Sequence, residues 1–318
     1  MSPHAEGSLL TRYAAARTSH LTELVTEREG KAMAGIDVSA LSQKAEQLRA
    51  LHHTGRILVL PNIWDPGGAR MMAWLGYPAV ATASASIAYS LGYDDGQQIT
   101  LEAMLDVVGR VASAVHVPVT ADMEWGYAEE PQEVAENMRR VLRAGAVGIN
   151  LEDSVREGER LFEVEFQCAR IRAVREMARQ EGVPLFINAR TDIFWPRVPG
   201  TEAEKFEQAV RRAQAYFEAG ADCFYPIILG DLGTLRRLYE AIRAPINVLA
   251  PTSQAALCEL EAAGIARLSL GPGLMWASLT IMKKIAAELQ NYGSFDLFTR
   301  DIITLDEIKQ YISKTPMR

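Results

Sequence analysis

Short runs of consecutive apolar residues recur along most of the chain and alternate with longer segments in which apolar residues repeat every three or four positions. The short runs are continuous, which predicts strands that are buried on both faces, as in a parallel sheet. The periodic segments predict amphipathic helices that cover those strands. The eight predicted strands are 57–60, 79–82, 117–121, 147–151, 184–187, 223–225, 246–249 and 267–270.

A predicted helix follows each of these strands. The helices are 68–75, 101–115, 131–144, 163–180, 202–219, 232–242, 254–263 and 274–289, and one more at 39–53 precedes the first strand, with Ser39 expected as its cap. Glycine directly follows several of them, as in Ala144-Gly145, where it supplies a left-handed C-cap. Eight strand–helix units predict the α/β class and a (β/α)8 barrel. An open doubly wound sheet is the alternative, but no G-x-G-x-x-G motif follows a strand.

The barrel pattern occupies residues 39–295 and shows no internal boundary. Residues 1–38 precede it and carry scattered charge, so we interpret them as an N-terminal arm. Residues 296–318 are predicted to form a C-terminal helical extension, with one amphipathic helix at 305–313 that Thr304 caps. The sequence therefore predicts one catalytic domain with an appendage at each end.

The composition of the 318 residues excludes some classes of protein. With 48% apolar residues, the chain has enough apolar surface to offset the entropy of folding, so wholesale disorder is excluded. The net charge of −7 argues against a protein that binds nucleic acid through its phosphates. A small anionic substrate needs only a local cationic pocket, so the overall charge does not argue against one.

The three cysteines lie far apart and form no zinc-binding spacing, which favours a reduced, cytoplasmic setting. No uninterrupted apolar run of about 18 residues occurs, so we expect no transmembrane helix. The first twenty residues lack a long apolar signal core, although their small and mildly basic residues leave a transit peptide as the alternative.

Acidic residues follow three successive predicted strands, at the end where the active site of a (β/α)8 barrel lies. They are Asp95, Asp122, Glu124 and Glu152. Oxygen ligands at this density predict Mg2+ or Mn2+ rather than zinc. No histidine lies at a strand end, so we expect neither a histidine-based triad nor a zinc site. Asp153 and Asp192 fit either this site or a solvated acidic rim.

Arg190 ends the fifth run, and its planar fork fits a substrate carboxylate, with an ion pair across the barrel mouth as the alternative. Trp64 follows the first strand, and we assign it to substrate contact. Ser84 and the backbone after it could donate hydrogen bonds to an oxyanion, unless this serine only packs in a loop. Tyr93 and Tyr127 fit either an acid or a pocket wall.

Six segments occur in order between residues 39 and 295, namely LVLPNIWDPGGAR, SASIAYSLGYDDGQ, VPVTADMEWGYAE, AGAVGINLEDS, LFINARTDIFW and IARLSLGPGLM. Together they resemble the isocitrate lyase/phosphoenolpyruvate mutase superfamily. The resemblance implies a (β/α)8 barrel whose eighth helix is swapped between the subunits of a homodimer or homotetramer. It also implies Mg2+, a 2-oxo or 2-hydroxy carboxylate substrate, and C–C or C–P chemistry through an enolate-like intermediate.

The resemblance also assigns roles to the acidic residues. Asp122 matches the aspartate that contacts the metal directly, and Glu124 stands where the family usually has a second aspartate. Glu152 and Asp95 match the positions that act on the metal through bound waters. Arg190 matches the arginine that grips the substrate carboxylate. We therefore place Asp122, Glu124 and Glu152 at the metal.

Ser84, Ala85 and Ser86 match the loop whose serine and backbone amides hold the carboxylate and oxyanion of the substrate. The predicted catalytic residues are Arg190, Ser84, Asp95 and Glu124. The predicted substrate contacts are Ser84, Ala85, Ser86, Asp95, Arg190 and Trp64.

The chain departs from the family after the fourth strand. The true lyases carry a K-[KR]-C-G-H lid loop whose cysteine is the acid/base, whereas this chain has EDSVREGERLFEVEFQ, with Cys168 further on as a packing residue. The polar lid residue of the mutase and hydrolase branch is also absent, which leaves Glu157 and Arg160 as open substitutes. Ile227 and Trp125 stand at pocket positions and indicate a smaller or more apolar pocket.

These observations predict a Mg2+-dependent lyase that cleaves a C–C bond in a small 2-oxo or 2-hydroxy (di)carboxylate. The first alternative is a phosphonopyruvate hydrolase or mutase, which acts on a C–P bond. The second is a barrel without catalysis that binds a metabolite, or a partner through its N-terminal arm. We expect no nucleic-acid or membrane partner.

Overall fold

The computed structural model describes residues 37–155, 158–250, 253, 255–300 and 302–312. The chain divides into two compact units, Met1–Val38 and Ser39–Arg318. The predicted N-terminal arm lies outside the described residues as far as residue 36, so the second unit carries the fold described below.

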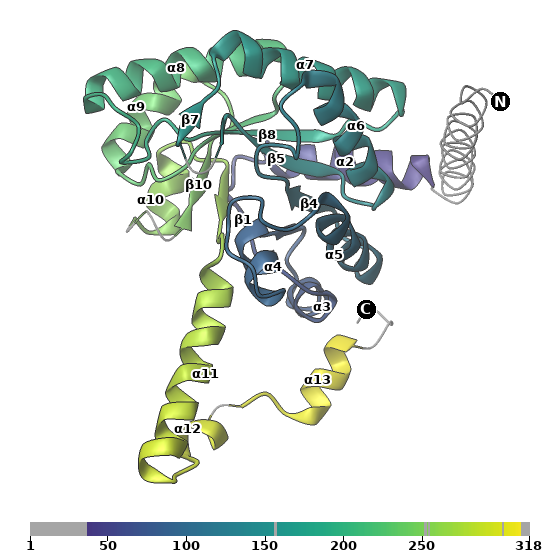
Figure 1. Cartoon of the computed structure of the whole chain (residues 1–318), viewed down its shortest axis with the longest axis vertical. Coiled ribbons are helices and arrows are strands. Elements are labelled where there is room, and N and C mark those ends of the chain that lie inside the picture. The colour runs from purple at the N-terminus through teal and green to yellow at the C-terminus, as the bar shows by residue number, and fades with distance from the viewer. Residues whose placement is uncertain (1–36, 156–157, 251–252, 254, 301, 313–318) are drawn as a thin grey trace, which may run out of the picture. The chain divides into compact units, whose positions relative to one another are not determined.

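Parallel strands form two hydrogen-bonded sheets at the centre of this unit (Figure 1). The larger sheet has the order β2 (Asn62–Ile63), β3 (Val80–Thr82), β4 (Val119–Asp122), β5 (Gly148–Glu152), β8 (Phe186–Thr191) and β9 (Cys223–Pro226). The smaller has the order β1 (Leu58–Leu60), β11 (Arg267–Ser269) and β10 (Asn247–Leu249).

Two connections relate these sheets. The chain passes from β1 into β2 through Pro61, and an isolated parallel bridge joins Phe224 in β9 to Ile246 beside β10. The strands therefore follow one another in the cyclic order of a (β/α)8 barrel, which confirms the predicted fold class. All eight predicted strands are found, and the largest shift is in β8, which continues to Thr191 rather than ending at Ile187.

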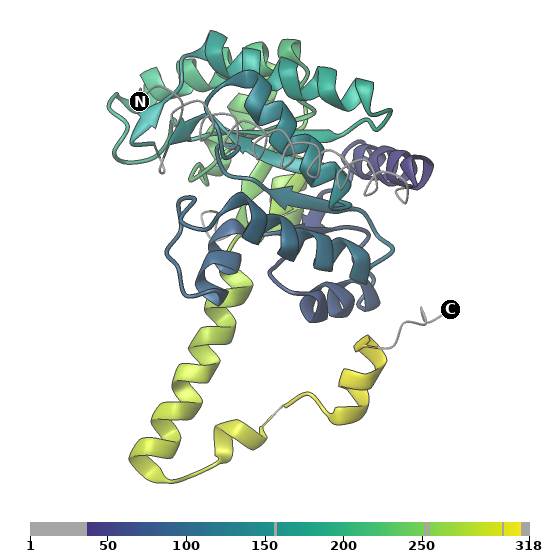
Figure 2. The same ribbon diagram turned by 45° about the vertical axis from the view of Figure 1, so that its right-hand side comes forward.

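Helices cover the outside of the strands (Figure 2). They are α2 (Val38–Leu51), α3 (Pro66–Trp74), α5 (Leu101–Ala114), α6 (Pro131–Arg143), α7 (Val164–Gln180), α8 (Glu202–Ala219), α9 (Leu232–Ile242) and α10 (Leu257–Ala262). Side chains cap several of their N-termini, and at α8 Thr201 and Glu204 form a reciprocal capping box. Ser39 was wrongly expected as a cap, because α2 begins one residue earlier at Val38.

Two further elements were not predicted. Residues Ser84–Ser90, expected as a loop, form the short helix α4. After β5, the strands β6 (Ser154–Val155) and β7 (Arg160–Leu161) pair antiparallel as a small hairpin. Both follow strand ends, so they border the edge where the predicted site residues lie.

The core lies between the strands and their helices. All residues of β3 and β5 are buried, as expected for strands that are covered on both faces. Each aliphatic side chain buried there contributes about 1.5–3 kcal/mol relative to exposure. Polar side chains are buried among the strands as well, including Asn150, Asn188 and Arg267.

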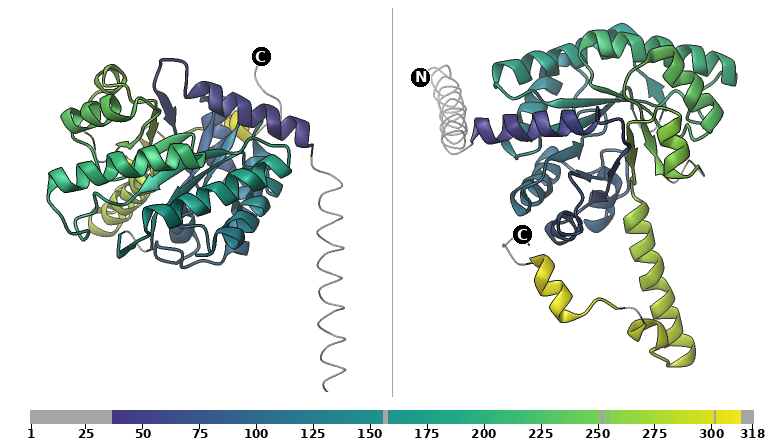
Figure 3. Two further views of the ribbon diagram at one scale, coloured as in Figure 1. Left: turned by 90° about the horizontal axis from the view of Figure 1, so that it is seen from above. Right: turned by 180° about the vertical axis from the view of Figure 1, so that it is seen from behind.

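The helix that follows the last barrel strand does not pack along the barrel. This helix, α11 (Gly273–Tyr292), leads away from the strands and buries only Met275 (Figure 3). It is followed by α12 (Asp296–Thr299) and α13 (Leu305–Ile312), and α13 returns to pack against α3 through an edge-on contact of Tyr311 with Trp74. Within the described ranges, no helix is long and apolar enough to span a membrane.

Candidate active site

Asp122, the last residue of β4, is held by the first residue of α4. The hydroxyl of Ser84 donates to Oδ2 of Asp122 at 2.7 Å, and the Ser84 backbone N–H donates to the same oxygen at 3.2 Å. The Asp122 backbone N–H donates in turn to Oγ1 of Thr82 at 3.0 Å. Two residues predicted for the site are therefore in direct contact. The Ser84 hydroxyl faces a carboxylate in this structure, where an oxyanion contact was expected.

The other oxygen of Asp122 belongs to a ladder of amides across neighbouring strands. Strand register places Asp122 beside Asn150 and Asn150 beside Asn188. Nδ2 of Asn150 donates to Oδ1 of Asp122 at 3.2 Å, and Nδ2 of Asn188 donates to Oδ1 of Asn150 at 2.8 Å. Neither amide is among the site residues predicted from the sequence. The two-residue period of a strand could have identified them. It places Asn150 on the same face of β5 as Glu152, and Asn188 on the same face of β8 as Arg190.

Glu124 lies just beyond Asp122 in a strained backbone conformation. Its φ is +50°, in the left-handed region, and its carbonyl accepts the Glu152 N–H at 2.9 Å. Its side chain is buried. Burial and the negative charges of Asp95 and Asp122 raise the pKa of Glu124 to about 8. These three carboxylates are therefore close enough to repel one another.

Arg190 makes an ion pair with Glu152, its register partner on the adjacent strand. Nη1 of Arg190 lies 2.7 Å from Oε2 of Glu152. Asp192 binds the other edge of the guanidinium, with Nε donating to Oδ1 at 2.7 Å and Nη2 donating to Oδ2 at 3.2 Å. Burial opposes the charge of Arg190, but the two carboxylates outweigh it and hold its pKa well above the ordinary value. The ion-pair alternative for Arg190 is thus present in the structure.

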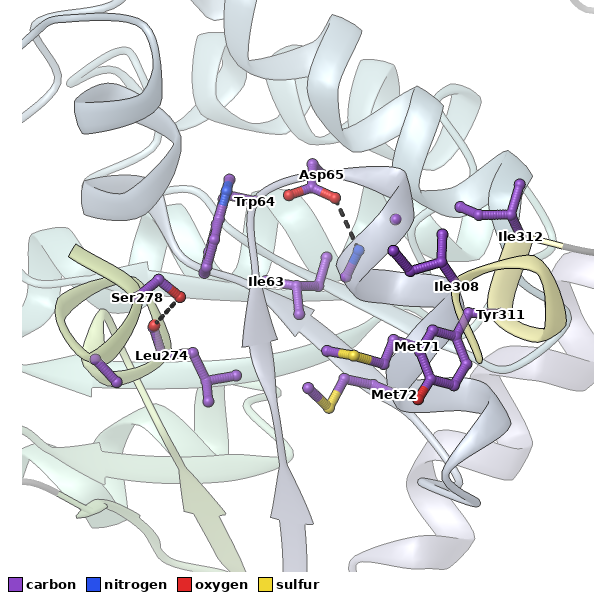
Figure 4. A pocket seen from close by; sticks show the side chains of 13 residues that line it. Ile63, Trp64, Asp65, Met71, Met72, Leu274, Ser278, Ile308, Tyr311 and Ile312 are labelled. Atoms are coloured by element: carbon purple, nitrogen blue, oxygen red, sulfur yellow. Dashed lines mark hydrogen bonds between the residues drawn. The ribbon is translucent and has the colours of Figure 1, made fainter. Parts of the chain in front are cut away.

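The remaining predicted residues lie in α4, in the loop after it and directly after β2. Ala85 and Ser86 are buried in α4, and the Ser86 hydroxyl has no hydrogen-bond partner among the described residues. Asp95 is half-buried in the loop after α4. Trp64 lines an apolar cavity of about 430 Å³ between α3, α11 and α13. Met71 and Leu274 also line this cavity (Figure 4). The substrate contact of Trp64 stays a prediction.

The residues whose roles the sequence left open differ in their exposure and contacts. Tyr127 is half-buried and its hydroxyl has no partner in the described part of the chain, whereas Tyr93 is exposed. Burial, and after it the charge of Glu124, raises the pKa of Tyr127. Cys168 is buried on α7. Arg160 pairs with Glu129 on the surface, and Glu157 lies outside the described residues.

The donor set can be compared with the needs of a divalent cation. No group of three or more His, Cys, Asp or Glu side chains in the described residues is arranged to hold a metal ion directly. Asp122 and Asp95 nevertheless both lie near Glu124, because burial and then their two negative charges raise the pKa of Glu124. Hard oxygen donors around one direct ligand fit Mg2+, which keeps several of its waters.

Comparison with known proteins adds an independent finding. A family model described as phosphoenolpyruvate phosphomutase matches residues 48–290. An uncharacterised protein of Mycobacterium tuberculosis is 32% identical over 221 residues, which cover 70% of this chain and 80% of that protein. A 2-methylisocitrate lyase of Aeropyrum pernix is 32% identical over 203 residues, 63% of this chain and 63% of that enzyme.

Solved structures show the same fold. A protein of Burkholderia cenocepacia, described provisionally as a lyase/mutase, has a TM-score of 0.79 and 32% identity, over 86% of this chain and 97% of that chain. A phosphonopyruvate hydrolase solved with oxalate and Mg2+ has a TM-score of 0.73 at 19% identity, over 84% of this chain and 94% of that chain. At that identity, the second likeness concerns the fold alone.

Proposed function

Because this chain belongs to the isocitrate lyase/phosphoenolpyruvate mutase superfamily, we propose that it is a Mg2+-dependent lyase that cleaves a C–C bond in a small 2-oxo or 2-hydroxy carboxylate. The observation that carries the proposal is the Arg190 guanidinium beside Glu152, at the strand ends where Asp122 and Glu124 also lie. A cationic fork next to several carboxylates suits a substrate carboxylate on one side and a divalent cation on the other.

Arg190 is assigned to the substrate carboxylate. Its hydrogen bonds to Asp192 engage two of the five N–H donors of a guanidinium, and Glu152 contacts Nη1 as an ion pair. The planar fork thereby keeps donors for a further anion while its orientation is fixed. The substrate would be held by one carboxylate, which leaves the adjacent 2-oxo or 2-hydroxy oxygen to be bound by neighbouring groups.

Asp122 is assigned to direct contact with Mg2+, and Glu124, Glu152 and Asp95 to contact through bound waters. When bound, Mg2+ supplies positive charge that stabilises the enolate oxygen left by C–C cleavage. The protein contributes the fixed orientation of Asp122, whose oxygens accept from Ser84 and Asn150. It also provides the buried environment of Glu124, in which electrostatic interactions are stronger than in water.

The start of α4 is assigned to the substrate oxyanion. The backbone N–H groups of Ala85 and Ser86 belong to the first helical turn, where no helical carbonyl can accept them. The Ser84 N–H donates to the Asp122 carboxylate, so the N–H groups of Ala85 and Ser86 are the donors assigned to the oxyanion at this edge of the barrel. Preorganised donors of this kind stabilise charge that develops during the reaction.

Tyr127 is assigned as the acid in place of the missing lid cysteine, because burial and the nearby carboxylates raise its pKa and keep its hydroxyl protonated. It lies on the same loop as Glu124, and the charges of Glu124, Asp122 and Asp95 all act on it. Its buried hydroxyl has no hydrogen-bond partner among the described residues, so it has a donor available for substrate. Tyr93 is exposed, which makes it the weaker candidate.

Calorimetry with oxalate, a mimic of the pyruvate enolate, tests the proposal. We expect oxalate to bind when Mg2+ is present and not to bind when the metal is chelated. In Asp122→Ala, Mg2+ should no longer promote oxalate binding. The control Asp106→Ala, on the exposed face of α5, should still bind oxalate when Mg2+ is present. If Asp122→Ala kept full Mg2+ affinity and full turnover of 2-oxo and 2-hydroxy acids, the assignment would be wrong.

Product analysis separates the alternatives. Release of phosphate from phosphonopyruvate would identify a hydrolase, and its rearrangement to phosphoenolpyruvate would identify a mutase. The match to a phosphomutase family model favours this C–P class as the alternative. Cleavage of a 2-hydroxy dicarboxylate into two carbonyl-containing fragments would identify the C–C lyase. Oxalate binding without turnover of either class would identify a metabolite-binding barrel without catalysis.

A second copy of the chain is the proposed partner. The helix α11 buries one residue, while Trp276 and Met282 are 50% and 64% exposed. The cavity beside Trp64 opens between the first two turns of α11 and the helices α3 and α13 (Figure 4). An apolar helix that leaves its own barrel and an apolar cavity next to its base favour a homodimer in which α11 packs on the partner.

A further inference from the structure

Asp192 makes two hydrogen bonds to the Arg190 guanidinium, so the orientation of this guanidinium does not depend on a substrate. Both carboxylate oxygens of Asp192 accept from Arg190, at 2.7 Å from Nε and 3.2 Å from Nη2. This paired geometry fixes the plane of the guanidinium as well as its position. Glu152, by contrast, contacts a single nitrogen, Nη1.

Asp192 is itself held rigidly. Its side chain is fully buried, and the hydroxyl of Ser154 donates to its Oδ2. The Ser154 hydroxyl oxygen also accepts the backbone N–H of Gly158 at 2.9 Å, which ties it to the connection between β6 and β7. The Asp192 backbone N–H donates to Oδ1 of Asp153 at 3.0 Å.

Asp153 links this group to the outer helix α8. Its Oδ2 accepts from Nη1 of Arg212 at 3.0 Å and from the hydroxyl of Tyr216 at 2.7 Å. Arg212 and Tyr216 are both buried, and they contact each other at 2.8 Å. A continuous series of polar contacts therefore runs from the body of α8 to the guanidinium of Arg190.

We propose that Asp192 is a positioning residue that orients Arg190 for carboxylate binding. This inference rests on the proposed function of Arg190. A free arginine side chain has several rotatable bonds, and the conformations it loses on binding weaken the interaction with substrate. With Asp192 in place, that ordering occurs on folding. Asp192 acts through Arg190 and has no contact of its own with substrate.

The test is Asp192→Asn, measured by calorimetry with oxalate and Mg2+ and by steady-state kinetics on any substrate that is turned over. An amide has one acceptor oxygen and one donor nitrogen, so it cannot accept both Arg190 N–H groups. We expect oxalate affinity to fall about tenfold or more, in line with the loss of hydrogen bonds to a charged group. KM should rise by a similar factor, with kcat changed much less.

Asp222→Asn is the matched control. The Asp222 side chain is 9% exposed and is also paired with arginine, with Arg175 Nη2 at 2.6 Å and a second contact to Arg49, but it lies at the opposite end of the strands, directly before β9. We expect this variant to lose stability and to keep wild-type oxalate affinity. A fall in oxalate affinity equal to that of Asp192→Asn would mean that any buried ion-pair loss has this effect, and would overturn the inference.

Arg190→Gln separates the inference from the proposed function. If Arg190→Gln abolishes oxalate binding while Asp192→Asn leaves it unchanged, the positioning role is wrong and the proposed function stands. If Arg190→Gln leaves oxalate binding unchanged, the proposed role of Arg190 fails and the inference fails with it. Should Asp192→Asn not fold, Ser154→Ala tests the same point, because it removes one hydrogen bond from Oδ2 of Asp192. Unchanged oxalate affinity in that variant would count against the inference.

Discussion

The hydroxyl of Ser84 donates to Oδ2 of Asp122 at 2.7 Å and so joins the first residue of α4 to the last residue of β4. The two residues are 38 positions apart in the chain. Their contact depends on the parallel pairing of β3 with β4, because that pairing brings the ends of both strands to one edge. The orientation of a carboxylate that we assign to the metal therefore depends on a neighbouring strand–helix junction.

Ser84→Ala tests this dependence. Among the described residues, removing the hydroxyl leaves Oδ2 of Asp122 with only the Ser84 backbone N–H at 3.2 Å, so the carboxylate is less well ordered. We expect Mg2+ affinity to fall about tenfold, as is usual when a partner of a metal ligand is removed. Titration calorimetry with Mg2+ measures the change. Ser90→Ala, at the other end of α4, is the control and should keep wild-type affinity. Equal affinities in all three proteins would contradict the prediction.

Arg170 stabilises the loop after β4, and Arg170→Met should be strongly destabilising. Its guanidinium donates to the carbonyl oxygens of Trp125, Ala128 and Glu152 from a buried position. The variant leaves these oxygens without their donor, which should lower the free energy of unfolding by about 3 kcal/mol. Urea denaturation measures it. Arg172→Met, exposed on the same helix, should change stability by less than about 0.5 kcal/mol.

The strands were predictable because parallel strands that are covered on both faces need uninterrupted apolar runs. The helix α4 was not, because its sequence SASIAYS is too short to show a helical period and has serine at three of seven positions. Serine side chains compete for backbone hydrogen bonds and favour turns in isolation. Burial of Ala85, Ile87 and Ala88, together with the contact of Ser84 to Asp122, makes the helix favourable only in the folded chain.

The acidic residues and Arg190 were predictable from their position at the ends of buried runs. The partners of these residues were not, since partners depend on strand register. Asn150 reaches Asp122 because β4 and β5 pair with Asp122 opposite Asn150. Asp192 fitted either the site or a solvated rim on sequence grounds, and only the fold reveals that it is buried against Arg190.

His52 predicts a pH dependence of stability. Burial, and after it the positive charge of Arg267, lowers the pKa of His52 from 6.5 to about 3, so the ring is neutral in the folded protein. The unfolded chain binds a proton to this residue below its ordinary pKa, so stability is lost as the pH falls through about 6.5. Between pH 7.5 and 5.5 this residue alone should lower the free energy of unfolding by about 1.3 kcal/mol.

The variant His52→Phe removes this contribution. A phenyl ring can keep the stacking on Phe186, whose centroid lies 4.1 Å from the imidazole, although the hydrogen bond to the Leu48 carbonyl is lost. The decrease in unfolding free energy from pH 7.5 to 5.5, measured by urea denaturation, should be smaller than in the wild type by about 1.3 kcal/mol. Identical decreases in both proteins would show that His52 does not contribute.

The exposed face of α11 predicts that a single charge will dissociate the proposed homodimer. Met282 is 64% exposed on a helix that buries only Met275 in its own chain. We therefore expect the second subunit of the proposed homodimer to cover Met282. Met282→Glu places a carboxylate in an interface that we expect to be apolar, where an unpaired charge is costly. Light scattering coupled to size-exclusion chromatography should then give the mass of one chain, compared with at least two for the wild type. Lys284→Glu adds a carboxylate on the same helix at a residue that is already charged, and should stay oligomeric. A monomeric wild type would contradict the proposed partner.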